Sequence, residues 1–211
     1  MSAEEEVVEM SVSLNEGQEI TLKNRYGKKL KNIKIKIGWT IPYNLNGMWF
    51  SDFFENNALE CNAYMLMCQD DVTYEEDIIS YCNPEHESKS VRYLCKCLKE
   101  NGSVTEIMSI NLENVPEEYD GIVFMADVSD TKFSKQDFGI IKNAYVKIIE
   151  EENNQTVCHY NLLKKYDGMM SILLGAIFRN GRDWEFCAIG EGRKETILNQ
   201  VMRRTDNVET A

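Results

Sequence analysis

Apolar and polar residues alternate along most of this chain, which is the pattern of half-buried β-strands. The clearest case is residues 33–37, where three isoleucines point to one face and two lysines to the other. Turn formers such as Asn83-Pro84 and Asn101-Gly102 separate similar runs. The further strands expected are 12–14, 20–22, 63–67, 78–81, 91–98, 107–112, 122–128, 144–149, 157–162, 171–178 and 184–189. Many short strands predict a mainly β fold, a β-sandwich of two packed sheets.

Helical signals are few. Ser134 stands three residues before the acid Asp137, a spacing typical of a helix start. A second helix is expected near the end of the chain, where apolar residues recur at helical spacing and basic residues follow. Its members are Ile197, Leu198, Val201, Met202, Arg203 and Arg204. The predicted fold is therefore a single-domain β-sandwich with a few short helices, including a C-terminal one.

One domain is expected, because no internal repeat or flexible linker interrupts the pattern. Its predicted bounds are 11–204. Residues 1–10 are expected to be a disordered acidic leader, and 205–211 a polar tail. A chain of 211 residues is long enough to bury a full core.

Charge narrows the possible partners. The net charge is −12, from 35 acidic and 23 basic residues, which argues against nucleic acid and anionic membrane surfaces. Cations or basic protein surfaces suit it better. No apolar run of about 18 residues suggests a membrane span, and the acidic start is unlike a secretory signal. Seven scattered cysteines in such a chain indicate reduced thiols. We therefore expect a cytoplasmic protein with protein partners.

Cys95-x-Cys97 could suggest zinc or a redox pair. On a regular strand, both thiols would share a face with Val91 and Tyr93, while Lys96 would point the other way. That face is apolar, and the C-x₂-C signature of zinc sites is missing, so the pattern favours core cysteines.

Catalysis finds little support in the sequence. His86 falls in a polar turn, and His159 follows Cys158 on a strand, where neighbours face opposite ways. No nucleophile elbow or phosphate-binding loop is present. We expect a protein that is not an enzyme.

Several segments resemble the TerD family of tellurite-resistance and stress proteins, in the order in which that family has them. They are Val12–Leu22, Lys36–Trp39, Tyr119–Phe124, Asp137–Ile148 and Ala176–Gly192. Each motif alone is modest, but their order and spacing are specific, and they cover nearly the whole chain. The resemblance implies a β-sandwich and a role in stress response.

The resemblance also implies a calcium site, whose motifs are degraded here. Family members carry an Asp-Leu-Asp-x-Ser stretch and an acidic Gly-Asp-rich loop. Here the first stretch keeps Glu60 and Asn62, and the second keeps Glu106, while Lys96 stands where the family has Asp. Calcium takes six to eight oxygens, several from carboxylates, so these remnants predict weak or lost binding.

Three functions remain open. The first is a stress-response interaction module with a degenerate calcium site. The second is a calcium sensor or buffer that recruits unusual ligands, such as Glu60, Asn62, Glu106 and the acids of 70–77. For the segment 70–77, a solvated acidic loop is the simpler interpretation. The third is a small-anion or cyclic-nucleotide binder at Arg179, Arg182 and Arg193. The aromatic stretch 48–54 would be a partner patch if exposed, and burial is its default.

Overall fold

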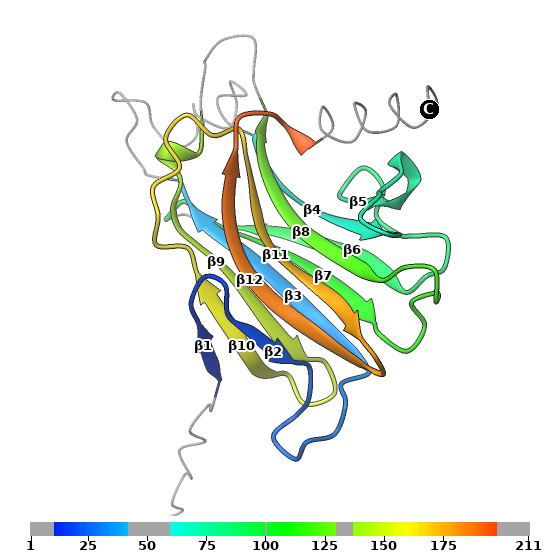
Figure 1. Cartoon of the computed structure of the whole chain (residues 1–211). Helices are drawn as coiled ribbons and strands as arrows, with labels where there is room; N and C mark the ends of the chain where they lie inside the picture. The colour runs from blue at the N-terminus through cyan, green and yellow to red at the C-terminus, as the bar shows by residue number, and fades with distance from the viewer. Residues whose placement is uncertain (1–10, 42–59, 100, 130–136, 198–211) are drawn as a thin grey trace, which may run out of the picture.

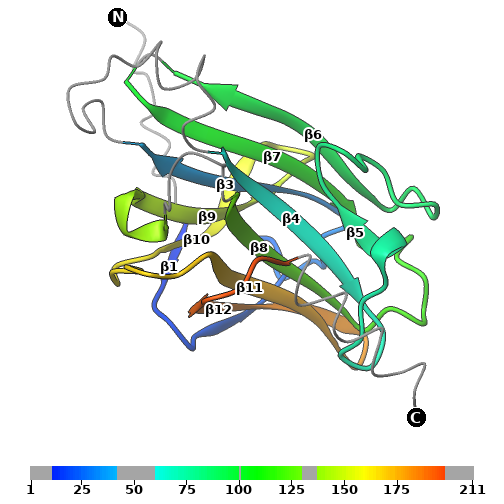
Figure 2. The ribbon, with the colours of Figure 1, turned by 90° about the horizontal axis from the view of Figure 1, so that it is seen from above.

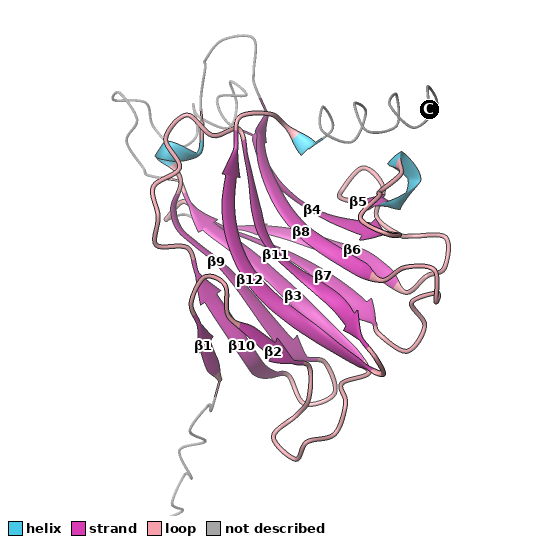
Figure 3. Cartoon of the chain, in the orientation of Figure 1, coloured by secondary structure: helices cyan, strands magenta, loops and turns pink. Residues whose placement is uncertain are grey.

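The computed structural model describes residues 11–41, 60–99, 101–129 and 137–197. Over these ranges it is built from strands, with only short helical turns (Figures 1 and 3). The strands are β1 Val12–Leu14, β2 Glu19–Thr21, β3 Asn32–Thr40, β4 Glu60–Cys68, β5 Ile78–Ile79, β6 Val91–Leu98, β7 Ser103–Asn111, β8 Gly121–Ser129, β9 Lys142–Glu150, β10 Gln155–Asn161, β11 Ser171–Asn180 and β12 Asp183–Arg193. The 3₁₀ turns are η1 Glu75–Asp77 and η2 Phe138–Ile140.

The strands form two six-stranded sheets that face one another (Figure 2). Sheet A has the order β1-β10-β9-β3-β7-β6, and sheet B has the order β2-β12-β11-β8-β4-β5. All neighbours are antiparallel except β1 and β10, which are parallel. The predicted mainly β sandwich is confirmed.

The core lies between the sheets. Ile33, Ile35 and Ile37 of β3 are at most 1% exposed, as their alternation with lysines predicts. Opposite them, sheet B contributes Phe124 and Phe186, whose rings pack with centroids 6.2 Å apart. Burial of this apolar face is the main driving force for pairing the two sheets.

Gly38 shows why one strand position tolerates no side chain. A Cβ there would fall on the ring of Tyr145, which lies across β3. The Tyr145 hydroxyl reaches the Thr105 hydroxyl on the far neighbour strand, at 3.2 Å. The glycine thus gives the ring a flat surface on which to cross.

Two helix predictions meet different outcomes. The helical turn after Asp137 is η2, and the Asp137 carboxylate caps it by accepting the Gly139 N–H at 2.7 Å. The proposed N-cap Ser134 lies outside the described residues, as do 198–204, so the C-terminal helix stays a prediction. The leader, the tail and the aromatic stretch 48–54 also lie outside. Among the described residues, no helix has the length and apolar character that a membrane span requires.

Candidate functional site

A β-bulge in β6 decides which side chains meet between the sheets. Tyr93 pairs with Met108, Leu94 is the extra residue, and Cys95 pairs with Ile107. A bulge puts two residues of one strand opposite one of its partner, so it inverts the faces beyond that point. Lys96 therefore lies opposite the inward-facing Glu106 of β7. The expectation that Lys96 points away from the core is wrong for this reason.

The Lys96 ammonium sits in a cage of oxygens that bridges the sheets. Its Nζ donates to the Cys61 carbonyl at 2.7 Å and to Asn62 Oδ1 at 2.9 Å, both on β4 of sheet B. It also forms an ion pair with Glu106 Oε1 at 3.2 Å. The Trp39 ring lies beneath it, with the Nζ 5.8 Å from the ring centroid. A side-chain cation thus joins the edge strand of sheet A to sheet B.

Glu106 is the most buried member of this cage, with a side chain that is 0% exposed. Burial raises its pKa, and the Lys96 ammonium and the Ala63 N–H, which donates to Glu106 Oε2 at 3.1 Å, oppose that rise. Burial and the same carboxylate raise the pKa of the neighbouring Tyr93 hydroxyl. An ionised carboxylate at this depth depends on its cation.

The three residues predicted as calcium ligands are placed as follows. Asn62 and Glu106 come together, both around the Lys96 Nζ. Glu60 begins β4 opposite Ser129, and its side chain lies outside the described part. Two of the three predicted remnants, Asn62 and Glu106, thus converge, but on an ammonium. Within the described ranges, no three His, Cys, Asp or Glu side chains gather as metal ligands.

Asp127 is a buried carboxyl that the sequence analysis missed. It lies on β8 directly opposite Asn62 and is 3% exposed. Burial raises its pKa to about 6, although the Tyr64 hydroxyl and the Ile197 N–H, which donate to it, act in the opposite direction. The available signal was a single charged residue within the apolar run 122–128.

Asp127 makes stability fall as pH rises. Its pKa is raised from 3.8 to about 6 in the fold, so between these values the folded state holds a proton that the unfolded chain has lost. We expect the unfolding free energy contributed by this group to decrease by about 2–3 kcal/mol from pH 4 to pH 7. Chemical denaturation at several pH values, compared with Asp127→Asn, measures this. If the free energy of unfolding changed with pH in the same way in both proteins, the assignment of this pH dependence to Asp127 would be contradicted.

A second polar cluster joins two loops. The Asp77 carboxylate accepts the Tyr119 hydroxyl at 2.7 Å and lies 3.1 Å from His86 Nε2. His86 Nδ1 contacts the Ser88 hydroxyl at 2.7 Å. His86 lies in the polar turn region, as the sequence predicts, but its side chain is only 2% exposed.

The acidic segment 70–77 is divided by the fold. Asp70, Asp71, Glu75 and Glu76 are exposed, as the solvated-loop interpretation predicts, while Asp77 is turned inward to His86. The acids of this segment therefore do not converge on one point.

The three arginines of the anion hypothesis do not meet. Arg179 and Arg193 lie at opposite ends of the β11–β12 hairpin. The Arg179 guanidinium donates to the carbonyls of Tyr119, Val115 and Pro116 at 2.7–3.1 Å and stacks 4.2 Å over the Trp184 ring. It holds the loop before β8 in place.

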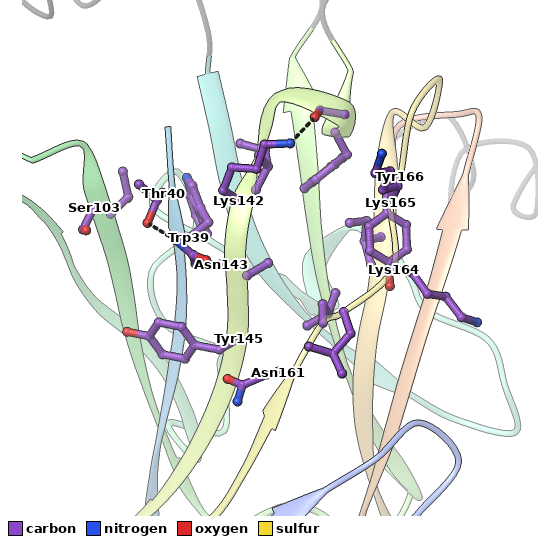
Figure 4. Close-up of a pocket in the computed structure, with 18 of the residues that line it drawn as sticks. Trp39, Thr40, Ser103, Lys142, Asn143, Tyr145, Asn161, Lys164, Lys165 and Tyr166 are labelled. Atoms are coloured by element: carbon purple, nitrogen blue, oxygen red, sulfur yellow. Dashed lines mark hydrogen bonds between the residues drawn. The ribbon is translucent and has the colours of Figure 1, made fainter. Parts of the chain in front are cut away.

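Lysines gather instead around an open cavity of about 780 Å³ at the end of the sandwich (Figure 4). Lys142, Lys164 and Lys165 line it, together with Tyr145 and Asn161. Lys164 is paired with Glu16 at 2.6 Å, and the Lys142 ammonium donates to the Gly139 carbonyl at 3.3 Å. Lys99 also lines the cavity, so two of its four lysines, Lys142 and Lys164, are bound to other groups of the protein.

The expectation that Cys95 and Cys97 lie in the core is wrong. Cys61, Cys68 and Cys158 are buried, but Cys82, Cys95 and Cys97 are exposed. The bulge at Leu94 is the reason for the last two, since it turns them to the outer face of sheet A. No disulfide joins any of the seven, all of which are within the described residues.

The two facing six-stranded sheets define a class, the TerD-like β-sandwich. A solved homologue of telluride resistance protein (TerD) from Streptomyces coelicolor A3(2) has a similar fold, with a TM-score of 0.58 over 82% of this chain and 95% of that one, at 11% identity. The model of the TerD domain matches residues 10–204. This chain belongs to the TerD family, and the resemblance found in its motifs is confirmed.

Curated relatives agree with the family assignment. Stress response protein SCP2 of Bacillus subtilis is 31% identical, over 92% of this chain and 99% of its own length. Tellurium resistance protein TerD of Serratia marcescens is 27% identical, over 87% of this chain and 91% of its own length. The stress-response and tellurium-resistance family is thereby shown.

Proposed function

We propose that this chain is a non-enzymatic stress-response protein that acts in the cytoplasm as an interaction module, and that its calcium site is replaced by the Lys96 ammonium. The observation that carries the proposal is the position of Lys96 Nζ among the Cys61 carbonyl, Asn62 Oδ1 and Glu106 Oε1. These are the oxygen types that would otherwise ligate calcium.

A divalent ion does not fit beside this lysine. An ammonium 3.2 Å from the shared carboxylate repels a second cation at close range, and the Glu106 side chain that it pairs with is 0% exposed. The oxygens that the described residues place around the Lys96 ammonium number fewer than the six to eight that calcium takes. The Lys96 ammonium is part of the chain, so it stays in place at any calcium concentration. It therefore holds the two sheets together without calcium.

The interaction role rests on the family and on charge. Relatives that cover nearly the same length are named for stress response and tellurium resistance. The net charge of −12 favours basic protein surfaces as partners. Both nitrogens of the buried His86 are committed to Asp77 and Ser88, which favours a structural role for that cluster over a catalytic one.

Calcium titration of the metal-stripped protein tests the proposal. We expect no binding heat and an unchanged melting curve at millimolar calcium. In Lys96→Asp the ammonium is replaced by a carboxylate, and we expect binding in the range of about 10⁻⁴–10⁻³ M. Calcium at ten times that Kd would stabilise the variant by about 1.4 kcal/mol.

The alternative function, a calcium sensor with other ligands, predicts the reverse pattern. Micromolar calcium binding by the unaltered protein, with a large rise in melting temperature, would refute the tethered-cation proposal. Lys99, an exposed lysine three residues after Lys96 and outside the cage, provides the matched control. Lys99→Asp makes the same change of charge without creating a calcium site.

A further inference from the structure

Two thiols stand together on the outer face of sheet A. Cys95 Sγ and Cys97 Sγ are 3.8 Å apart, and both residues are exposed. They lie on β6, which is the edge strand of its sheet. The side chain of Lys96, which lies between them in sequence, points the other way, to Glu106 between the sheets.

The position of the two thiols follows from the register of β6. Residues two apart on a strand share a face, and the bulge at Leu94 selects the outward one. The inward ion pair of Lys96 with Glu106 fixes that choice, because a slip by one residue would bury both thiols and expel the ammonium. The thiols are therefore held side by side and open to solvent.

The distance between the two sulfurs matches what an ion bound by both would require. Two sulfurs bound to one centre at about 2.3 Å with a tetrahedral angle lie about 3.8 Å apart. Soft thiolate ligands select thiophilic centres over hard cations such as calcium. We propose that Cys95 and Cys97 form a two-thiol site for a thiophilic metal or metalloid ion, separate from the Lys96 cage.

Phenylarsine oxide is a suitable probe, because its trivalent arsenic takes two thiols. Two As–S bonds form and the As–O bonds break, and the two thiol protons leave with the oxygen as water. The arsenic keeps its oxidation state, so no oxidant or reductant is needed. Bridging makes the second bond intramolecular, which strengthens binding by about 10²–10⁴-fold over a single thiol.

The experiment counts thiols in the reduced, folded protein with a thiol-specific chromogenic reagent. Three exposed cysteines, Cys82, Cys95 and Cys97, should react rapidly. One equivalent of phenylarsine oxide should protect two of the three. A small dithiol should release the arsenical, while a monothiol at the same concentration should not.

Matched variants assign the site. Cys95→Ser and Cys97→Ser should each weaken arsenical binding at least 100-fold and make it reversible by monothiols. Cys82→Ser removes a lone exposed thiol and should leave binding unchanged. Melting curves of all three verify that each folds. Equal binding by Cys95→Ser and the unaltered protein, or loss of binding in Cys82→Ser, would overturn the proposal.

Discussion

Replacing Lys96 by Met should lower the free energy of unfolding by about 2–3 kcal/mol at pH 7. Removing one partner of a buried ion pair costs about 3–5 kcal/mol, because the other charge is left without compensation. The expected loss is smaller here, since the Lys96 side chain is 36% exposed while that of Glu106 is 0% exposed. Urea denaturation of the variant and the unaltered protein measures the difference.

The pH dependence separates this effect from simple loss of packing. Without the ammonium, Glu106 can avoid an unpaired buried charge only by taking a proton, and burial already raises its pKa. The destabilisation should therefore shrink as the pH is lowered and Glu106 becomes neutral. Lys99→Met removes an exposed lysine and should change stability little. If Lys96→Met behaves like Lys99→Met at every pH, the cage does not stabilise the sandwich.

Replacing Asp77 by Ala should destabilise the protein by about 3 kcal/mol. The change leaves two buried groups without their acceptor, the Tyr119 hydroxyl and His86 Nε2. Each buried polar group that loses its partner costs about 1–3 kcal/mol. Thermal and urea denaturation measure the loss.

Neighbouring residues provide the comparison for Asp77. Glu76→Ala removes an exposed carboxylate of the same turn and should have little effect. Asp77→Asn keeps an acceptor oxygen, so it should recover part of the stability lost in the alanine variant. Equal stabilities of Asp77→Ala and Glu76→Ala would show that the Asp77–His86–Tyr119 cluster does not hold the two loops together.

Much of the architecture could be predicted from local pattern. Alternation with period two identified the strands, because side chains on a strand point alternately to the two faces. The isoleucines of β3 are buried as that rule requires. The ordered motifs indicated the family, and the domain model that matches residues 10–204 bears this out.

The candidate site could be predicted only in part. The family resemblance implied one site with Glu60, Asn62 and Glu106, and the structure places Asn62 and Glu106 around Lys96. Asp127 and the contact of Asp77 with Tyr119 were missed because the partners are distant in sequence. Asp127 accepts hydrogen bonds from Tyr64 of β4 and from the Ile197 N–H, and Asp77 accepts one from the Tyr119 hydroxyl.

The sequence by itself determined the strands, the family and the acidic charge, because each depends on composition or on residues close together in the chain. Tertiary structure alone decided which way Lys96, Cys95 and Cys97 face. Periodicity assumes a regular strand, and one extra residue at Leu94 reverses the assignment beyond it. The bulge lets Lys96 reach oxygens of Cys61 and Asn62 on the opposite sheet. Such a contact depends on residues far apart in the chain, so no local pattern encodes it.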